Sequence, residues 1–251
     1  MAPKRKPFQG VVNIIRFNWH FYVITVILFA ALFLLTDKAP ELIQSLLKAG
    51  GLIAAFSIII SLSISFYIYD LSDLYHLKWI DTANNGKILN IHAGFDETSE
   101  IIRDKFVCVD LITCDFYDPT KHTEVSIKRA RKLYPPSSSN IAVQTNQLPF
   151  TDDVFDTSLT VLSAHEIRNQ DERICFIKEL GRITKPSGQI LVTEHLRDFN
   201  NFLAYTIGFF HFYSRKNWLQ TFQKASLTVK QEVKITPFIS IFVLVKNGNT
   251  D

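Results

Sequence analysis

The chain has few of the residues that build disulfide frameworks or zinc knuckles. Its 251 residues include three cysteines, Cys108, Cys114 and Cys175. None has the C-x-x-C spacing and all lie among apolar residues, so we expect small buried side chains in a reducing compartment. An excess of charge is also missing, since 27 basic and 24 acidic residues give a net charge of +3. This balance gives no reason to expect a nucleic-acid partner.

Charge is absent altogether from two long stretches near the N-terminus. Residues 17–36 and 49–69 contain no Asp, Glu, Lys or Arg. A helix of about twenty residues crosses a hydrocarbon core of roughly 30 Å, and backbone in lipid must satisfy its own hydrogen bonds. We therefore predict two transmembrane helices, at about 17–36 and 49–69, within a membrane anchor that covers residues 1–75.

The charges beside these stretches predict how the hairpin is oriented. Lys4, Arg5, Lys6 and Arg16 precede the first stretch without an acidic residue, whereas two acids and two lysines balance each other between the stretches. Basic residues stay preferentially on the cytoplasmic side. The sequence thus predicts a two-pass membrane protein whose N-terminus and C-terminal domain both face the cytoplasm.

Two other interpretations of the apolar stretches are open. A basic start followed by an apolar run is also typical of a cleaved signal peptide, although that apolar region usually has about 7–15 residues and is not followed by a second span. A buried helical hairpin of a soluble protein is the other alternative. It is disfavoured because the residues around Ile58, Ile59 and Ile60 are apolar on every side.

From Lys87 onward, short β-branched runs alternate with helical segments. This alternation predicts an α/β fold over residues 76–251, with a doubly wound, mostly parallel seven-stranded sheet. The last two strands have no helix between them and should pair antiparallel. Ligands of such sheets bind outside the carboxyl ends of the strands. The expected strands are 87–92, 106–113, 141–145, 157–163, 189–193, 227–235 and 239–246, and the expected helices are 97–105, 124–133 and 171–183.

Three ordered motifs lie in this part of the chain. Residues 148–156 read LPFTDDVFD, residues 162–167 read LSAHEI, and residues 178–188 read KELGRITKPSG. In this order they resemble the class I S-adenosylmethionine-dependent methyltransferases, near the ubiquinone/menaquinone-biosynthesis type. The resemblance covers about residues 87–246. It implies a Rossmann-like methyltransferase fold and S-adenosylmethionine as the cofactor.

The resemblance also implies where the cofactor binds. The family's glycine-rich loop corresponds to residues 90–96, which read NIHAGFD and keep a glycine only at Gly94. Asn90 replaces the acid of the motif, and His92 and Asp96 replace glycines. The Asp96 carboxylate could pair with the cofactor's ammonium group or block it. The cofactor contacts expected in this region are Asn90, His92, Ala93, Gly94 and Asp96, with packing as the alternative role of His92.

Further cofactor contacts are expected after the second and third strands. Asp115 follows Gly94 by 21 positions, close to the roughly 20 that separate the loop from the ribose-binding acid in dinucleotide folds. It would accept hydrogen bonds from the ribose hydroxyls, with Asp118 as the alternative. Gln144 and Leu148 would flank the adenine. The helix expected at 124–133 is basic, and its Arg131 is expected on a solvated face.

The candidates for catalysis are His165, Glu166 and His195. His165 follows the fourth strand, and an imidazole there could take a proton from an acceptor near neutral pH. The alternative is that His165 and Glu166 cap the next helix. His195 ends the fifth strand after Glu194, where the alternative is a hydrogen-bonded pair that ties loops together. Because His211 has no evident partner and no H-x-x-x-H spacing occurs, no metal site is expected.

An aromatic segment, residues 199–218, follows the fifth strand. Three interpretations are open: it lines a pocket for an apolar acceptor, it lies on the bilayer with Arg215 and Lys216 at the headgroups, or it is a buried helix. Its aromatic residues are Phe199, Phe202, Tyr205, Phe209, Phe210, Phe212, Tyr213 and Trp218.

The sequence therefore predicts a membrane-anchored methyltransferase that transfers a methyl group from S-adenosylmethionine to a hydrophobic or lipid-like small molecule. Because the glycine loop is altered, a rival hypothesis is a catalytically inactive protein of the same fold that acts as a binding or scaffold module at the membrane. A nucleotide-dependent oxidoreductase is less favoured, since residues 92–97 do not supply G-x-G-x-x-G. The first two hypotheses differ in whether the domain binds S-adenosylmethionine.

Overall fold

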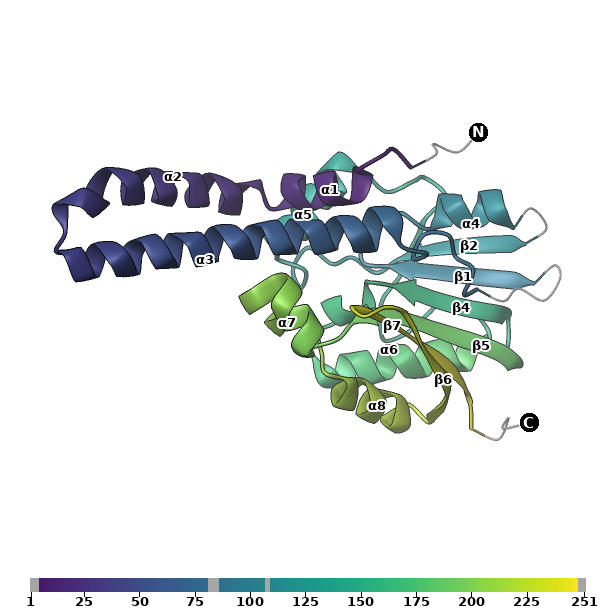
Figure 1. The fold of residues 1–251 in the computed structure, drawn as a ribbon. Helices are drawn as coiled ribbons and strands as arrows, with labels where there is room; N and C mark the ends of the chain where they lie inside the picture. The colour runs from purple at the N-terminus through teal and green to yellow at the C-terminus, as the bar shows by residue number, and fades with distance from the viewer. Residues whose placement is uncertain (1–4, 81–85, 107–108, 248–251) are drawn as a thin grey trace.

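The computed structural model describes residues 5–80, 86–106 and 109–247. In it, a seven-stranded sheet with helices on both faces carries a long helical hairpin (Figure 1). The strand order is β3-β2-β1-β4-β5-β7-β6, and β7 alone pairs antiparallel with its neighbours. The strands are β1 (Lys87–His92), β2 (Asp110–Asp115), β3 (Ile141–Ala142), β4 (Phe155–Val161), β5 (Thr184–His195), β6 (Leu227–Thr236) and β7 (Ile239–Lys246).

This architecture confirms the predicted doubly wound, mostly parallel sheet with its antiparallel final pair. Two strand boundaries differ clearly from those predicted. The second strand begins at Asp110 instead of residue 106, and the predicted residues 107–108 lie outside the described part of the chain. The fifth strand begins at Thr184 instead of residue 189, because Thr184 already pairs with Phe155 of β4 before a register shift leads to the pair of Thr157 with Gln189.

The sheet separates two apolar layers because side chains alternate along each strand. In β1, Leu89 and Ile91 point to a core that contains residues of α6 (Gln170–Ile183) and α8 (Arg215–Lys224). The intervening Ile88 points to the opposite layer, where α4 (Ser99–Lys105) packs. Helix α5 (Val125–Leu133) connects β2 to β3. From Ile88 to His92, strand β1 is buried on both faces, as expected for a central strand of a parallel sheet.

Local sequence signals set the limits of α6. The Asn169 side chain accepts a hydrogen bond from the Glu172 backbone N–H, which makes it the N-cap. Acidic residues lie in the first turn and Arg182 in the last, as the helix dipole favours. The helix buries one face against the sheet, formed by Phe176, Ile177, Leu180 and Ile183. His165 and Glu166 precede this cap, so the interpretation that they cap the helix is wrong.

The N-terminal part forms three helices, where two were predicted. A short helix, α1 (Gln9–Phe17), precedes α2 (Trp19–Leu35), and α3 (Glu41–Phe66) continues into a π-helical turn at Tyr67–Leu71. A 3₁₀ turn, Thr36–Lys38, closes the hairpin. The segments Trp19–Lys38 and Glu41–Leu71 are long and apolar enough to cross a membrane, and only 6% and 11% of their most apolar windows are buried. This exposure disfavours the buried helical hairpin.

The backbone of helix α1 donates hydrogen bonds to a side chain in the turn that follows α3. The two carboxylate oxygens of Asp70 accept the N–H groups of Gly10 and Val11 at 2.7 and 2.8 Å. A Cβ at Gly10 would lie 2.3 Å from the Cβ of Tyr69, so only glycine allows this approach. The carboxylate also suits the positive end of the α1 dipole. Asp70 therefore caps a helix sixty residues away in sequence.

We predict that Asp70→Ala loosens α1. Loss of a side-chain cap costs about 1 kcal/mol of unfolding free energy, and the α1 amides should exchange with solvent faster. Hydrogen–deuterium exchange and thermal unfolding of the detergent-solubilised protein would measure both effects. Asp37→Ala, at the exposed tip of the hairpin, is the matched control. Unchanged exchange of α1 in Asp70→Ala would contradict the assignment of this cap.

Candidate functional site

The carboxyl ends of β1, β2 and β4 open toward the base of the helical hairpin. Figure 1 shows that α1 and the domain-side end of α3 lie beside this edge of the sheet. The Glu97 carboxylate, in the loop after β1, accepts hydrogen bonds from Gln9 of α1 at 3.1 Å and from the Tyr75 hydroxyl at 2.7 Å, and pairs with Arg5 at 2.8 Å. The predicted cofactor loop is therefore held directly by the base of the hairpin.

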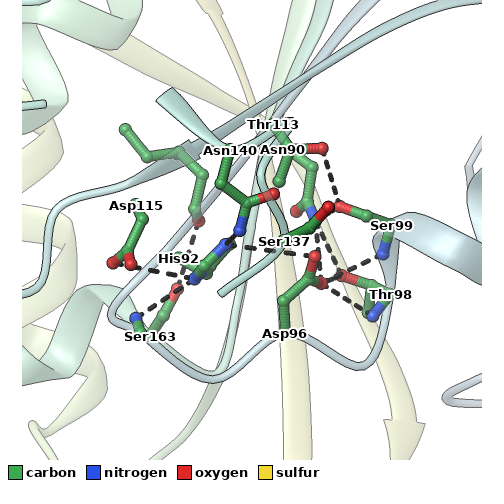
Figure 2. Close-up of polar contacts among 12 residues, drawn as sticks. Asn90, His92, Asp96, Thr98, Ser99, Thr113, Asp115, Ser137, Asn140 and Ser163 are labelled. Carbon is green, nitrogen blue, oxygen red and sulfur yellow. Dashed lines mark hydrogen bonds and ion pairs between the residues drawn. The ribbon is translucent and has the colours of Figure 1, made fainter. Parts of the chain in front are cut away.

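Asn90 and Asp96 interlock the loop after β1 with the start of α4 (Figure 2). The Asn90 amide nitrogen donates to the hydroxyls of Thr98 and Ser99 at 2.9 and 2.7 Å. Oδ1 of Asp96 accepts the N–H groups of Thr98 and Ser99 at 2.9 and 3.0 Å. Burial alone would raise the pKa of Asp96, but His92 and these hydrogen bonds lower it. The carboxylate thus stays ionised and holds the loop.

His92 fills the position of a family glycine. Its ring is 4% exposed, its Nδ1 accepts the Gly94 N–H at 3.1 Å, and its Nε2 lies 3.1 Å from the Asn140 amide (Figure 2). Burial lowers the pKa of His92, which favours the neutral ring that these contacts require. The neighbouring Ala93 is buried in the core. His92 therefore has the packing role that was its alternative, while cofactor contact by either residue stays a prediction.

Gly94 has a left-handed backbone, with φ of 90°. A Cβ there would lie 2.7 Å from the Arg131 guanidinium and 3.0 Å from the Tyr117 side chain, so the position requires glycine both for its φ and for space. Arg131 comes from α5 and lies 4.4 Å over the Tyr117 ring. The expectation of a solvated face for Arg131 is wrong, because its half-buried guanidinium pairs with Asp115 at the end of β2.

Asp115 ends β2 and is 6% exposed. Its Oδ1 accepts the Tyr117 N–H at 2.9 Å, and its Oδ2 accepts from Arg131 at 2.5 Å. The alternative acid, Asp118, instead holds an exposed turn through Thr120. Asp115 is thus the buried acid next to Gly94, and Arg131 is the cation that a ribose would have to displace from it.

A cavity of about 710 Å³ begins directly after Asp115. Tyr117, Asp118 and Gln144 line it, together with residues from the start of α6. Leu148 does not line it: this side chain is 2% exposed in the core, where the segment is held by Glu179, which accepts the Leu148 N–H at 2.8 Å. Gln144 therefore lies in this cavity and Leu148 does not, and the adenine contacts stay a prediction.

The His165 ring is oriented by a buried carboxylate. Its Nδ1 lies 2.6 Å from Oε2 of Glu194, and the Glu194 side chain, wholly buried, also accepts the His165 N–H at 3.1 Å. The carboxylate favours the tautomer that is protonated at Nδ1. Nε2 of His165 then carries the free lone pair and lies 3.5 Å from Oε1 of Glu166. These atoms lie just beyond the carboxyl end of β4, which we call the mouth of the site.

Sequence reasoning did not predict that His211 joins this group. Its Nε2 lies 3.5 Å from Oε1 of Glu166, and its Nδ1 lies 3.0 Å from Oε1 of Glu124. Burial alone would lower the pKa of His211, but hydrogen bonds to Glu124 and Glu166 raise it to about 9. Burial would raise the pKa of Glu166, but the hydrogen bond to His211 and the charges of His165, His211 and Arg168 lower it to about 2. No spacing in the sequence signals this contact, because η4 (Thr206–His211) brings His211 to β4 only in the fold.

His195 has no nitrogen left for a substrate. Its Nε2 accepts from the Tyr69 hydroxyl at 2.8 Å, and its Nδ1 lies 3.0 Å from the Asn201 side-chain oxygen and 3.1 Å from the Phe238 carbonyl. Burial lowers its pKa to about 4, so the ring is neutral near pH 7. These contacts favour the alternative role of a tie between loops, although the partners are Tyr69 and Asn201 and not Glu194.

The aromatic segment divides into an exposed and a buried part. Phe199 of α7 (Phe199–Tyr205) and Ile207 and Phe210 of η4 are 71%, 81% and 62% exposed. Phe212 and Trp218 are buried, and Phe212 stacks on His195. Helix α7 packs against α3. The interpretation as one buried helix is therefore wrong for the first half of the segment, which forms an apolar surface beside the hairpin.

These residues fit the adenosine half of S-adenosylmethionine, because a buried carboxylate lies at the end of β2 and a cavity follows it. At the methionine half, His92 and Arg131 occupy space that glycines leave open in the motif. His92 is fixed by Gly94 and Asn140, whereas the Arg131 side chain is 27% exposed and can turn outward. The site therefore fits the cofactor when Arg131 releases Asp115.

Comparison with known proteins identifies similar methyltransferases. A demethylmenaquinone methyltransferase from Paenarthrobacter aurescens is 30% identical over 115 residues, covering 46% of this chain and 41% of that protein. One from Beutenbergia cavernae is 27% identical over 108 residues, covering 43% and 40%. The chain thus spans about two fifths of the length of these relatives.

Solved structures share the fold at low identity. A SAM-dependent methyltransferase from Aquifex aeolicus aligns with a TM-score of 0.51 at 15% identity, over 69% of this chain and 89% of that one. A methyltransferase solved with the Trm112 activator of Haloferax volcanii aligns with a TM-score of 0.50 at 14% identity, over 76% and 96%. Likeness at this level shows the fold alone.

The family assignment comes from the sequence match, which spans the end of α3, the cofactor loop, Asp115, the His165 cluster and the aromatic segment. Residues 60–217 match the ubiE/COQ5 methyltransferase family, whose members use S-adenosylmethionine. With more than half of its residues in this match, the chain belongs to the ubiE/COQ5 methyltransferase family.

Proposed function

We propose that this protein is a membrane-anchored methyltransferase that methylates a hydrophobic molecule dissolved in the bilayer. The observation that carries the proposal is the position of the site near the base of the two apolar helices. Gly94 lies in the loop that Glu97 joins to α1, and the buried Asp115 ends the neighbouring strand β2. A site so close to the membrane surface suits an acceptor that does not leave the lipid phase.

Each half of the cofactor would meet its own set of residues. Asp115 would accept hydrogen bonds from the ribose, Tyr117 and Gln144 would enclose the adenine in the cavity after β2, and the Gly94 turn would adjoin the methionine half. S-adenosylmethionine, when bound, supplies an electrophilic methyl group. Positioning provides much of the rate in such a transfer, because a well-oriented pair of reactants has already lost its translational freedom.

His165 would accept the proton of the acceptor. The buried Glu194 carboxylate holds Nδ1 and leaves the lone pair on Nε2 at the mouth of the site. A hydroxyl or an activated ring carbon gives up a proton when it gains a methyl group, and an imidazole can take that proton near neutral pH. Glu166, 3.5 Å from Nε2, would stabilise the imidazolium that forms.

The acceptor class is inferred from the relatives and from the apolar surface. Both curated relatives carry the name demethylmenaquinone methyltransferase, which suggests a quinone-type ring with an apolar tail. The exposed Phe199, Ile207 and Phe210 lie beside α3 and lead to His211 at the mouth. This surface would meet the bilayer and admit such a molecule sideways.

The rival function is that of a binding or scaffold module that does not catalyse. The side chains of His92 and Asp96 in the loop after β1, and of Arg131 on α5, favour it because they fill space that the motif leaves to the ligand. The two hypotheses separate on binding of S-adenosylmethionine.

One prediction of the proposed function concerns binding of the cofactor. The detergent-solubilised protein should bind S-adenosylmethionine and S-adenosylhomocysteine in calorimetric titration, and Asp115→Ala should weaken binding about 10- to 100-fold, since a hydrogen bond to a charged group contributes about 1.5–3 kcal/mol. Arg131→Met should tighten binding because the competing cation is gone. Asp118→Ala, in the wall of the same cavity, is the control and should bind normally.

Two outcomes of this titration would change the conclusion. Loss of binding in Asp118→Ala instead of Asp115→Ala would reassign the ribose acid. No binding by folded wild-type protein or by Arg131→Met would favour the scaffold function.

Another prediction concerns the orientation of the helical hairpin in the membrane. The basic flank before α2 predicts that the tip of the hairpin lies outside and the domain inside. A membrane-impermeant maleimide should label Lys38→Cys on intact cells, and it should label Ser137→Cys, in an exposed loop of the domain, only after permeabilisation. The unsubstituted chain controls for its own cysteines. Labelling of Ser137→Cys on intact cells would reverse the topology.

A further inference from the structure

Three side chains at the mouth of the site point nitrogen and oxygen atoms at one another. They are His165 and Glu166, which follow β4, and His211, which ends η4. Their ligand atoms all lie within 4.8 Å of one another, and among the described residues this is the one group of three His, Cys, Asp or Glu side chains that could share a metal ion. His165 is buried and the other two are half-buried.

Two of the distances between the ligand atoms of this group match those of a tetrahedral zinc centre. Oε1 of Glu166 lies 3.5 Å from Nε2 of His165 and 3.5 Å from Nε2 of His211. Two ligands about 2.1 Å from a tetrahedral zinc ion lie about 3.4 Å apart. Two imidazoles and one carboxylate are also a known set of three protein ligands for zinc, with the fourth position open.

Both histidines are held by a second carboxylate on their other nitrogen. Nδ1 of His165 lies 2.6 Å from Glu194, and Nδ1 of His211 lies 3.0 Å from Glu124. Metal-binding histidines usually donate their second N–H to a carboxylate or carbonyl, which fixes the tautomer and makes the free nitrogen a better ligand. Both Nε2 atoms are thereby directed at the same oxygen of Glu166.

One cation already contacts the group. The Arg168 guanidinium hydrogen-bonds Oε1 of Glu124 at 3.0 Å and lies against the His211 ring, 2.7 Å from its Nε2. A metal ion on His211 would have to displace it. The Arg168 side chain is 39% exposed, so it can turn to solvent, where water hydrates its charge.

We propose that His165, Glu166 and His211 form a binding site for a divalent transition-metal ion, with Zn²⁺ as the natural probe. Two imidazoles and a carboxylate, supported by Glu124 and Glu194, supply three ligands and leave a coordination position open to the mouth. His211 releases its proton to solvent when the metal binds. An oxygen of an acceptor could take that position, where the ion would acidify its hydroxyl so that the proton passes to solvent water instead of to His165. Linear spacing hides the site, because His211 is 45 residues beyond Glu166.

The test is zinc binding by the full chain without an affinity tag. The detergent-solubilised protein is stripped with a chelator, dialysed and titrated with ZnCl₂ in a calorimeter, and the metal bound per chain is measured by elemental analysis. Wild type should bind one ion. His211→Ala and the near-isosteric Glu166→Gln should weaken binding at least about tenfold, and Glu124→Gln about 10- to 100-fold.

Two further variants make the assignment specific. Arg168→Gln should tighten zinc binding because it removes the competing cation. His76→Ala removes an exposed histidine outside the group and should bind like wild type. Visible absorption after loading with Co²⁺ should report a site of low coordination number in wild type and disappear in Glu166→Gln.

The proposal would be overturned if folded wild-type protein bound no zinc, or if Glu166→Gln and His211→Ala bound as much as wild type. Either result would mean that a proton on His211, not a metal, bridges the two carboxylates. Thermal unfolding of each variant checks that it is folded. Metal binding is measured without methyl transfer, so failure of this proposal and failure of the methyltransferase proposal remain distinguishable.

Discussion

The carboxylate of Glu97 is the contact on which the arrangement of anchor and domain depends. It lies in the loop after β1 and receives Arg5 and Gln9 from one end of the hairpin and Tyr75 from the other. Its side chain is 11% exposed, and a buried carboxylate of this kind is stable only with such partners. The ends of both apolar helices therefore converge on the loop that would hold the cofactor.

The residues that replace the motif in the loop after β1 pack closely and satisfy one another's hydrogen bonds. His92 fills the volume of a missing glycine and satisfies the Gly94 N–H, while Asn90 and Asp96 share the Thr98 and Ser99 hydroxyls and amides. Substituting one of these residues with the family's residue would leave its partners unsatisfied, which is costly in a buried site. Arg131 is different, because its partly exposed side chain contacts Asp115 from outside the loop. Of the residues that depart from the motif, Asn90, His92 and Asp96 are therefore fixed by their buried contacts, whereas Arg131 beside the loop can move.

The sequence allowed prediction of the sheet, since alternation of apolar residues with helical segments depends only on local pattern. The first strand at 87–92 and the last at 239–246 have the predicted boundaries. Helix α1 was not predicted because Asp70, which caps it, is sixty residues away. Arg131, His211 and Leu148 were misplaced for the same reason: each depends on which helix or turn packs against a strand end, and no local pattern encodes that.

His165 and His195 show how the fold assigns different roles to the same residue type at neighbouring strand ends. Both His195 nitrogens are used, by Tyr69 on one side and by Asn201 and Phe238 on the other, so the ring joins the hairpin to the sheet. His165 has one nitrogen held by Glu194 and one directed at the mouth. A free lone pair beside Glu166 can bind a proton or a metal ion, whereas His195 can bind neither without losing a buried hydrogen bond. We therefore assign the proposed chemistry to the His165 side, which is also the side that the exposed apolar surface of α7 and η4 approaches.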